Sequence, residues 1–283
     1  MGTARNSLPY TLSSPAALVM LAFVAVPLVL TLSQSLYGTL GNGVAHLSFM
    51  QYREVFGDTY YRNIYLRTFE LSVVVTFICI LIGVPEAYVL SRLSQRWRAL
   101  SMFVVLGPLL MSVVVRTLGW AVLLGSDGII NSTLLRLGLI DEPIRMMFTF
   151  TGIVIALVHV LVPFMVLAVW TSLQKADLST EQAAETLGAS PLTILRRIVF
   201  PQVIPGVLSG GLIVFALTAS AFATPAIIGG RRLKVVPTTI YDEILSNLNW
   251  PLGTALAVVL MVAVLLVSIG VGRYVENRYK QVF

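Results

Sequence analysis

Six long apolar runs dominate this chain and set the class of fold it can adopt. They cover residues 15–36, 68–90, 100–124, 149–173, 203–228 and 252–274. Each reaches about 20 residues or more, the length a helix needs to cross the hydrocarbon core of a bilayer. In lipid every backbone polar group needs a partner within the protein, which a helix provides. The sequence therefore predicts an all-α integral membrane protein with six transmembrane helices.

The charge content agrees with a bilayer as the main solvent. Only 11% of the 283 residues are charged, against roughly 25% in soluble domains. The first run is too long for the apolar core of a signal peptide and lacks a clear small-x-small cleavage site, so we count it as a span. The net charge of +6 comes from basic residues at the ends of apolar runs, which membrane topology explains better than nucleic-acid binding.

The longest polar stretch on one side of the predicted membrane is residues 174–202, between the fourth and fifth runs. Its first half predicts a short helix that Ser179 or Thr180 caps, with Glu181 and Glu185 in its first turns, where the helix dipole favours acids. Gly188 is typical of the residue that ends such a helix.

A second helix follows the glycine. Ser190 and Pro191 predict its start, with proline in the first helical position, and Pro201 predicts its end. Small side chains at Ala183 and Ala184 leave a surface on which another protein can pack closely. Four apolar side chains can act as anchors, namely Leu187, Ile194, Leu195 and Ile198.

This polar stretch resembles the "EAA loop" of ABC importer permeases, whose pattern is Glu-Ala-Ala, three residues, Gly, and a later Ile-x-Leu-Pro. With Gly188 on the glycine, Ala183 and Ala184 fall on the two alanines, and Ile198 and Pro201 on the closing positions. Two positions depart from the pattern. Gln182 stands in place of the glutamate, directly after Glu181, and Phe200 in place of the leucine.

The resemblance implies the type I fold of ABC importer permeases and a role for the loop. In that family the loop is the coupling helix, which docks in a groove of a cytoplasmic nucleotide-binding subunit. We therefore expect eight residues of the loop to couple the chain to an ATPase, namely Glu181, Gln182, Ala183, Ala184, Leu187, Gly188, Ile198 and Pro201. Docking would fix the loop and both termini, residues 1–14 and 276–283, in the cytoplasm, with the permease domain over 15–275. This orientation puts ten Lys and Arg residues inside and eight outside, a difference too small to decide topology alone.

Further stretches are similar to spermidine/putrescine importer permeases across roughly residues 70–260. They are residues 116–120, 125–131, 134–140, 141–149, 163–166 and 249–253. The resemblance implies a bacterial inner-membrane importer of a polyamine, with opines, aminophosphonates and amino-acid-like solutes as alternatives. It also implies three partners: an ATPase dimer that holds ATP and Mg, a second permease subunit in a heterodimer, and a periplasmic binding protein. We expect short helices over 129–137 and 241–248 to face that binding protein.

Two ionisable residues inside the spans are candidates for the translocation path. Glu86 either lines the path and favours a cationic solute or reaches the interface and pairs with Arg92. Arg116 either lines a cavity or bonds backbone carbonyls where helices cross. Trp120 is the aromatic candidate for the same path.

Gly210 is the last candidate for the path, and it also belongs to a small-xxx-small face with Gly206 that lets helices approach closely. His159 is expected to donate an interhelical hydrogen bond. His46, His159 and Cys79 lie too far apart in the sequence to predict a metal site.

Neither catalysis nor ATP binding is expected on this chain. It has no Gly-x-x-x-x-Gly-Lys-Ser/Thr phosphate loop and no Ser-His-Asp or Cys-His arrangement, so ATP hydrolysis belongs to a separate subunit. An ion-driven secondary transporter is the alternative from another class. It would show ionisable residues at matching positions of two inverted halves, and Glu86 and Arg116 have no such counterparts.

Overall fold

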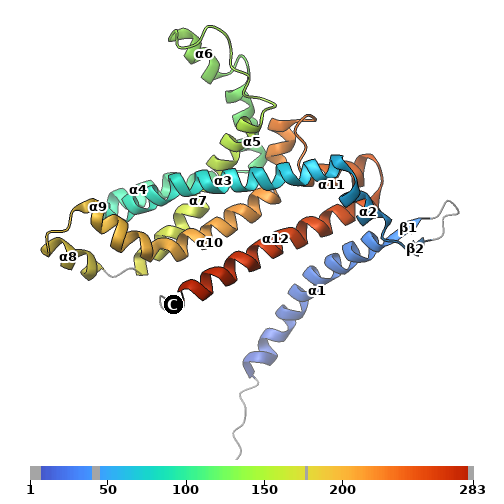
Figure 1. The fold of residues 1–283 in the computed structure, drawn as a ribbon, viewed down its shortest axis with the longest axis horizontal. Helices are drawn as coiled ribbons and strands as arrows, with labels where there is room; N and C mark the ends of the chain where they lie inside the picture. Colours follow the sequence, from blue (N-terminus) through green and yellow to red (C-terminus); the bar gives the residue numbers. More distant parts are fainter. Residues whose placement is uncertain (1–7, 40–44, 176–177, 280–283) are drawn as a thin grey trace, which may run out of the picture. The chain divides into compact units, whose positions relative to one another are not determined.

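The computed structural model describes residues 8–39, 45–175 and 178–279. These ranges leave out residues 1–7 and 280–283 of the two predicted cytoplasmic ends and residues 176–177 of the polar loop. Figure 1 shows the elements, which are in chain order α1 (Leu8–Leu36), β1 (Tyr37–Thr39), β2 (Ala45–Leu47), α2 (Met50–Gly57), α3 (Thr59–Arg92), α4 (Gln95–Leu106), η1 (Gly107–Leu110), α5 (Val113–Leu124), α6 (Ile129–Arg136), α7 (Phe150–Lys175), α8 (Leu178–Thr186), α9 (Pro191–Ile194), η2 (Leu195–Val199), α10 (Phe200–Ala219), η3 (Pro225–Gly229), α11 (Val236–Tyr241), η4 (Asp242–Ser246) and α12 (Trp250–Tyr279).

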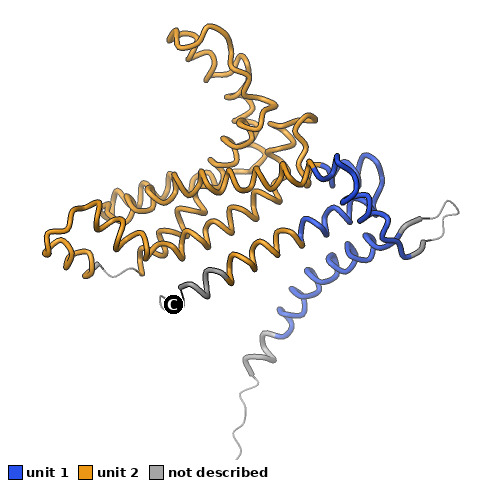
Figure 2. Tube along the Cα trace, in the orientation of Figure 1, with its two compact units in different colours: residues 1–62, 239–261 blue, residues 63–238, 262–283 orange. Residues whose placement is uncertain are grey.

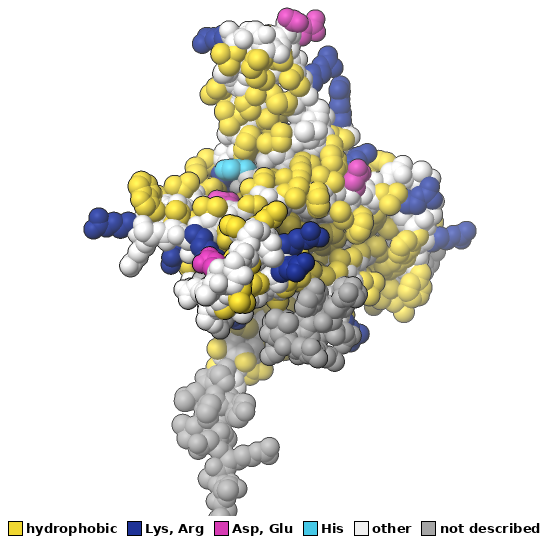
Figure 3. All heavy atoms as spheres, turned by 60° about the vertical axis from the view of Figure 1, so that its left-hand side comes forward, with side chains coloured by type: hydrophobic (Ala, Val, Ile, Leu, Met, Phe, Trp, Pro, Cys, Tyr) yellow, Lys and Arg dark blue, Asp and Glu magenta, His cyan; other side chains and the backbone are white. Residues whose placement is uncertain are grey.

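The prediction of an all-α fold with six membrane-spanning helical segments is confirmed. The segments long and apolar enough to cross a bilayer are Ser14–Leu36, Thr59–Arg92, Val113–Arg136, Phe150–Lys175, Pro191–Ala219 and Trp250–Arg273. Hydrophobic side chains are exposed along much of the chain's surface (Figure 3), as expected where helices meet lipid or another subunit.

The chain divides into two compact units, which Figure 2 shows in different colours. The smaller unit holds residues 1–62 and 239–261. In it a short antiparallel hairpin pairs Tyr37 with Leu47, and a 2.7 Å hydrogen bond between the hydroxyls of Ser35 and Tyr52 joins the end of α1 to α2. The η4 helix lies within the predicted range 241–248.

The larger unit, residues 63–238 and 262–283, is built around α7. Met165, Val166 and Val169 of α7 are fully buried, and α10 packs along the helix. Glycines allow this approach, because a Cβ at Gly206 would lie 2.7 Å from the carbonyl oxygen of Ala168, and one at Gly83 would lie 2.7 Å from Met165 Cγ. The small-residue face predicted for the fifth span therefore packs against α7 of the same chain.

The third predicted span, 100–124, is wrong as a single helix. The chain forms α4, a 3₁₀ turn and then α5. Pro108 has no N–H to donate, and Met111 and Ser112 then adopt extended backbone angles, with ψ of 148° and 135°. The break separates α4 from α5, and α6 then occupies nearly the range predicted for it.

The fifth predicted span, 203–228, also has the wrong bounds. The helix begins before residue 203, because α9, η2 and α10 run without interruption from Pro191 to Ala219. It ends at Ser220, and a separate π-helical turn starts at Pro225. A second break thus lies at residues 220–222.

Candidate functional site

The polar stretch between α7 and α10 forms a sharply bent helix–glycine–helix elbow, which we define as residues 178–201. Gly188 has a φ of +78°. Its N–H donates to Glu185 O at 2.9 Å, and the Ala189 N–H donates to Ala184 O at 3.0 Å. These two bonds form the Schellman motif that ends a helix at a left-handed glycine, so the predicted role of Gly188 in ending α8 is confirmed.

Capping residues define the second arm of the elbow as well. Ser190 Oγ accepts a hydrogen bond from the Thr193 N–H at 3.4 Å, and Pro191 occupies the first turn, as predicted. At the other end, Ser179 and Thr180 lie inside α8, so the predicted N-cap is wrong. Pro201 does not close the second helix. It lies in the first turn of α10 directly after the π-helical turn η2, so the helix continues through it.

The elbow divides its apolar side chains between the core and the surface. Ile194 is buried and Ile198 and Ala184 pack partly against the core. By contrast Leu187 is 88% exposed and Leu192 is 73% exposed. Gln182 and Ala183 are also exposed on α8. Large apolar side chains this exposed on a rigid turn are typical of a binding surface.

An ion pair ties the elbow to the end of α3. Arg92 Nη2 donates to Glu181 Oε2, and the Glu181 side chain is only 8% exposed while that of Arg92 is 42% exposed. The guanidinium also lies 5.1 Å from the centroid of the Tyr88 ring. The pairing of Arg92 with Glu86 that the sequence analysis considered is wrong, and the true partner, 89 residues away, carried no sequence signal.

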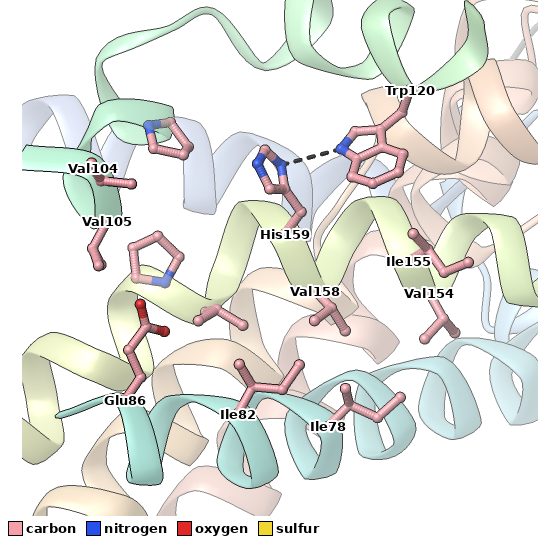
Figure 4. Close-up of a pocket in the computed structure, with 13 residues that line it drawn as sticks. Ile78, Ile82, Glu86, Val104, Val105, Trp120, Val154, Ile155, Val158 and His159 are labelled. Carbon is pink, nitrogen blue, oxygen red and sulfur yellow. Dashed lines mark hydrogen bonds between the residues drawn. The ribbon is translucent and has the colours of Figure 1, made fainter. Parts of the chain in front are cut away.

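A cavity of about 570 Å³ lies between α3, α4, α5 and α7. Figure 4 shows the Glu86 carboxylate of α3 pointing into it, with Trp120 of α5 and His159 of α7 on its far side. The rest of the wall is mainly apolar, including Val105 and Val158. The structure therefore brings two of the predicted path residues, Glu86 and Trp120, to one cavity.

Trp120 and His159 hold each other across two helices. Trp120 Nε1 donates to His159 Nδ1 at 3.1 Å, and the rings meet edge to face with centroids 5.4 Å apart. The predicted interhelical hydrogen bond of His159 is present, but its predicted direction is wrong, because His159 accepts the bond and Trp120 donates it. The bond fixes the indole at the mouth of the Glu86 cavity.

The other two path candidates lie elsewhere. Gly210 is buried against α7, where a Cβ would lie 2.9 Å from the Ala168 Cβ, so it packs helices together. Arg116 lines a neighbouring cavity of about 460 Å³, bounded by the two helix breaks. Among the described residues no metal-ligand cluster occurs.

This architecture defines a helical membrane transport subunit. The model of the family described as "binding-protein-dependent transport system inner membrane component" matches residues 83–281. The chain belongs to this family. It is a non-catalytic, multi-pass permease subunit of the inner membrane, from an ABC importer that works with a binding protein and an ATPase.

Individual relatives agree with the family. The chain is similar to the spermidine/putrescine transport system permease protein PotB of Haemophilus influenzae, with 31% identity over 85% of this chain and 84% of the relative. The Escherichia coli K12 protein of that name is 33% identical over 72% of this chain and 74% of the relative. A putative 2-aminoethylphosphonate permease, PhnU of Salmonella typhimurium, is 24% identical over 82% of this chain and 80% of the relative.

Solved structures show the same fold at lower identity. A bacterial ABC transporter for import of the acidic polysaccharide alginate matches with a TM-score of 0.77 and 16% identity, over 96% of both chains. The methionine ABC transporter in an inward-facing form matches with a TM-score of 0.59 and 18% identity, over 78% of this chain and 98% of the other. These likenesses establish the permease fold and leave the solute open.

Proposed function

We propose that the elbow binds a separate cytoplasmic ATPase and that this contact drives transport. The exposure of Leu187 carries the proposal, since an 88% exposed leucine at the tip of a hydrogen-bonded turn gains most by entering a groove of another protein. Leu192 and Ala183 extend the same surface. In this arrangement the loop and both chain ends lie in the cytoplasm, and the ATPase dimer holds ATP and Mg.

The two arms of the elbow transmit motion in different ways. The first arm is held to α3 by the ion pair between Glu181 and Arg92. The second arm is covalently continuous with α10 through η2. When ATP binding closes the ATPase dimer, displacement of the elbow moves α3 and α10 together, and the path opens to one side of the membrane at a time. Glu181 therefore acts within this chain, and Gln182 is the exposed neighbour that faces the ATPase.

A second permease subunit, most simply a related chain, completes the path, and a periplasmic binding protein delivers solute to the outer loops. We propose a polyamine such as putrescine or spermidine as the solute. Two PotB relatives above 30% identity support this choice. A cavity with a carboxylate on one side and an aromatic ring on the other also suits a solute that carries ammonium groups, as Glu86 and Trp120 provide here. An aminophosphonate or amino-acid-like solute is the second candidate, favoured by the PhnU similarity.

Docking is tested by placing a charge on the exposed leucines. Leu187→Asp and Leu192→Asp should each reduce co-purification of the ATPase and abolish ATP-driven uptake into proteoliposomes, while the permease stays in the membrane. Leu137→Asp is the matched control for ATPase recovery, because Leu137 is 66% exposed after α6, outside the elbow and in the range expected to face the binding protein. Normal ATPase recovery with Leu187→Asp and Leu192→Asp together would refute the docking role.

The solute is tested with the binding protein and the transporter together. Putrescine or spermidine should raise the melting temperature of the binding protein and enter proteoliposomes that hold the complete transporter. Glu86→Gln should weaken uptake of these cations, with Glu70→Gln, an exposed carboxylate on the same helix, as control. Stabilisation by aminophosphonates alone would replace the polyamine with the second candidate.

A further inference from the structure

The cavity around Arg116 lies where two helical runs are interrupted. One interruption contributes Leu109 and Met111, and the other contributes Ser220 and Phe222. Arg116 itself is on the first turn of α5, one turn before Trp120. Most of the remaining wall is apolar and includes Leu161 of α7. An arginine in such surroundings needs a partner to hold its charge.

The guanidinium of Arg116 has no such partner in the part of the chain that the structure describes. The residue is 8% exposed, and its Nε and Nη1 atoms are buried without a hydrogen-bond partner. The two hydroxyls of the wall already have partners: Thr224 Oγ1 lies 3.1 Å from Thr117 Oγ1, and Ser220 Oγ donates to Ala216 O at 2.8 Å. No acidic residue lines the cavity.

A buried cation without a counter-ion strongly destabilises a fold. Arginine cannot lose its charge at physiological pH, so the charge has to be met from outside this chain. The guanidinium presents paired N–H donors that match a carboxylate in a bidentate arrangement. The surrounding apolar wall excludes water and strengthens such a pair.

We propose that Arg116 is the anion-binding residue of this cavity and that its ligand is a carboxylate brought by another molecule. The inference rests on the proposed function, in which the path forms between two permease subunits. A polyamine carries no anionic group, so with a polyamine solute the carboxylate belongs to an aspartate or glutamate of the second permease. With an amino-acid-like solute it belongs to the solute itself.

The test uses the complete transporter expressed from its natural set of subunits. Arg116 is replaced by Gln, which removes the charge, by Met, which also suits an apolar cavity, and by Lys, which keeps the charge without the bidentate geometry. Arg136→Gln is the control for recovery of the second permease only, since Arg136 is exposed at the end of α6, within the range expected to face the binding protein. The readouts are the amount of this chain in the membrane, recovery of the second permease with it, and uptake of putrescine and of ornithine, which is putrescine bearing a carboxylate.

If the carboxylate lies on the second permease, Arg116→Gln and Arg116→Met should lower recovery of that subunit at least about tenfold. Arg116→Lys should give an intermediate recovery, and Arg136→Gln a normal one. One acid-to-amide change in the second permease should also lower recovery of that subunit by itself. In combination with Arg116→Gln, the same change should lower the recovery no further. A carboxylate on the solute predicts an intact pair of permeases, with ornithine uptake lowered at least about tenfold and putrescine uptake not lowered. That result supports the anion site, with the solute as the source of its carboxylate.

Two results would overturn the proposal. One is that Arg116→Gln and Arg116→Met behave like the natural protein, with recovery of the second permease and uptake of both amines within about twofold of its values. The other is loss of this chain from the membrane in Arg116→Met, because the guanidinium would then serve the fold of this chain alone. Recovery of the ATPase, which depends on the elbow, reports separately on the proposed function.

Discussion

Gly188 has a backbone conformation that side chains disfavour, so replacing it tests whether the elbow must keep its shape. Its φ is +78°, and no atom lies within 4 Å of the position that a Cβ would occupy. A substitution therefore adds backbone strain without a steric clash. The left-handed conformation costs an L-residue about 1–2 kcal/mol, and a β-branched residue is a genuine outlier there.

That strain sets the expected size of the effect. Because the cost falls on the native elbow, Gly188→Val should lower the ratio of the correctly bent elbow to its other conformations about 5–30-fold or more. ATP-driven uptake into proteoliposomes and recovery of the ATPase should fall as the population of the bent elbow falls. Gly188→Asn should stay close to the natural protein, because asparagine enters the left-handed region far more readily.

Gly138 provides a matched control for the same strain. It has a φ of +66° with open space around its Cβ position, but it lies in the loop after α6. Gly138→Val should therefore leave ATPase recovery unchanged. The reasoning fails if Gly188→Val transports normally, or if Gly188→Asn is as damaging as Gly188→Val.

Three further predictions concern stability, measured as the melting temperature of the assembled transporter. Arg92→Gln should lower the free energy of unfolding by about 1–3 kcal/mol, because it leaves a buried carboxylate unpaired. Glu181→Gln should lower it less, because the guanidinium of Arg92 still reaches water. Equal losses in the two variants would argue against burial as the cause. Gly206→Ala should lower the free energy of unfolding by about 1–3 kcal/mol through overpacking against α7. Gly270 has open space around it, so Gly270→Ala should leave that free energy unchanged or raise it by up to about 1 kcal/mol. The pKa of Glu54 is raised above its ordinary value, mainly by burial and to a smaller extent by two neighbouring carboxylates. The folded state therefore disfavours the charged form, and the charge of Glu54 opposes folding at neutral pH. Glu54→Gln should raise the melting temperature at pH 7 and have no effect below about pH 4; a gain that persists in acid would contradict this.

The parts of the fold that depend on local chemistry could be predicted from the sequence. The number of spans follows from apolar runs long enough to cross a bilayer. The bend at Gly188 and the cap at Ser190 follow from backbone preferences of single residues, and both are present in the structure. The helix breaks near Pro108 and Pro225 were missed because proline is tolerated inside membrane helices, so its presence alone does not decide between a kink and an end.

Contacts between distant segments could not be predicted in this way. The partner of Arg92 is Glu181 in the elbow rather than the nearby Glu86, because the end of α3 and the start of α8 meet only once the helices have packed. The two roles predicted for Gly210 could not be separated for the same reason. A glycine in a membrane helix suits both a path and a tight crossing, and only the position of α7 shows that it serves the crossing.

The way the elbow is attached has a consequence for coupling in the proposed mechanism. Its second arm continues into α10, which is held against α7 by glycine contacts too close for any side chain. In the part of the chain that the structure describes, an ion pair whose arginine is half-exposed links the first arm to α3. A pull on the elbow is therefore transmitted stiffly to α10 and more weakly to α3. Weakening the Arg92–Glu181 pair should then uncouple ATP hydrolysis from uptake, leaving ATPase recovery intact, whereas Gly206→Ala should lower the melting temperature without uncoupling the two activities.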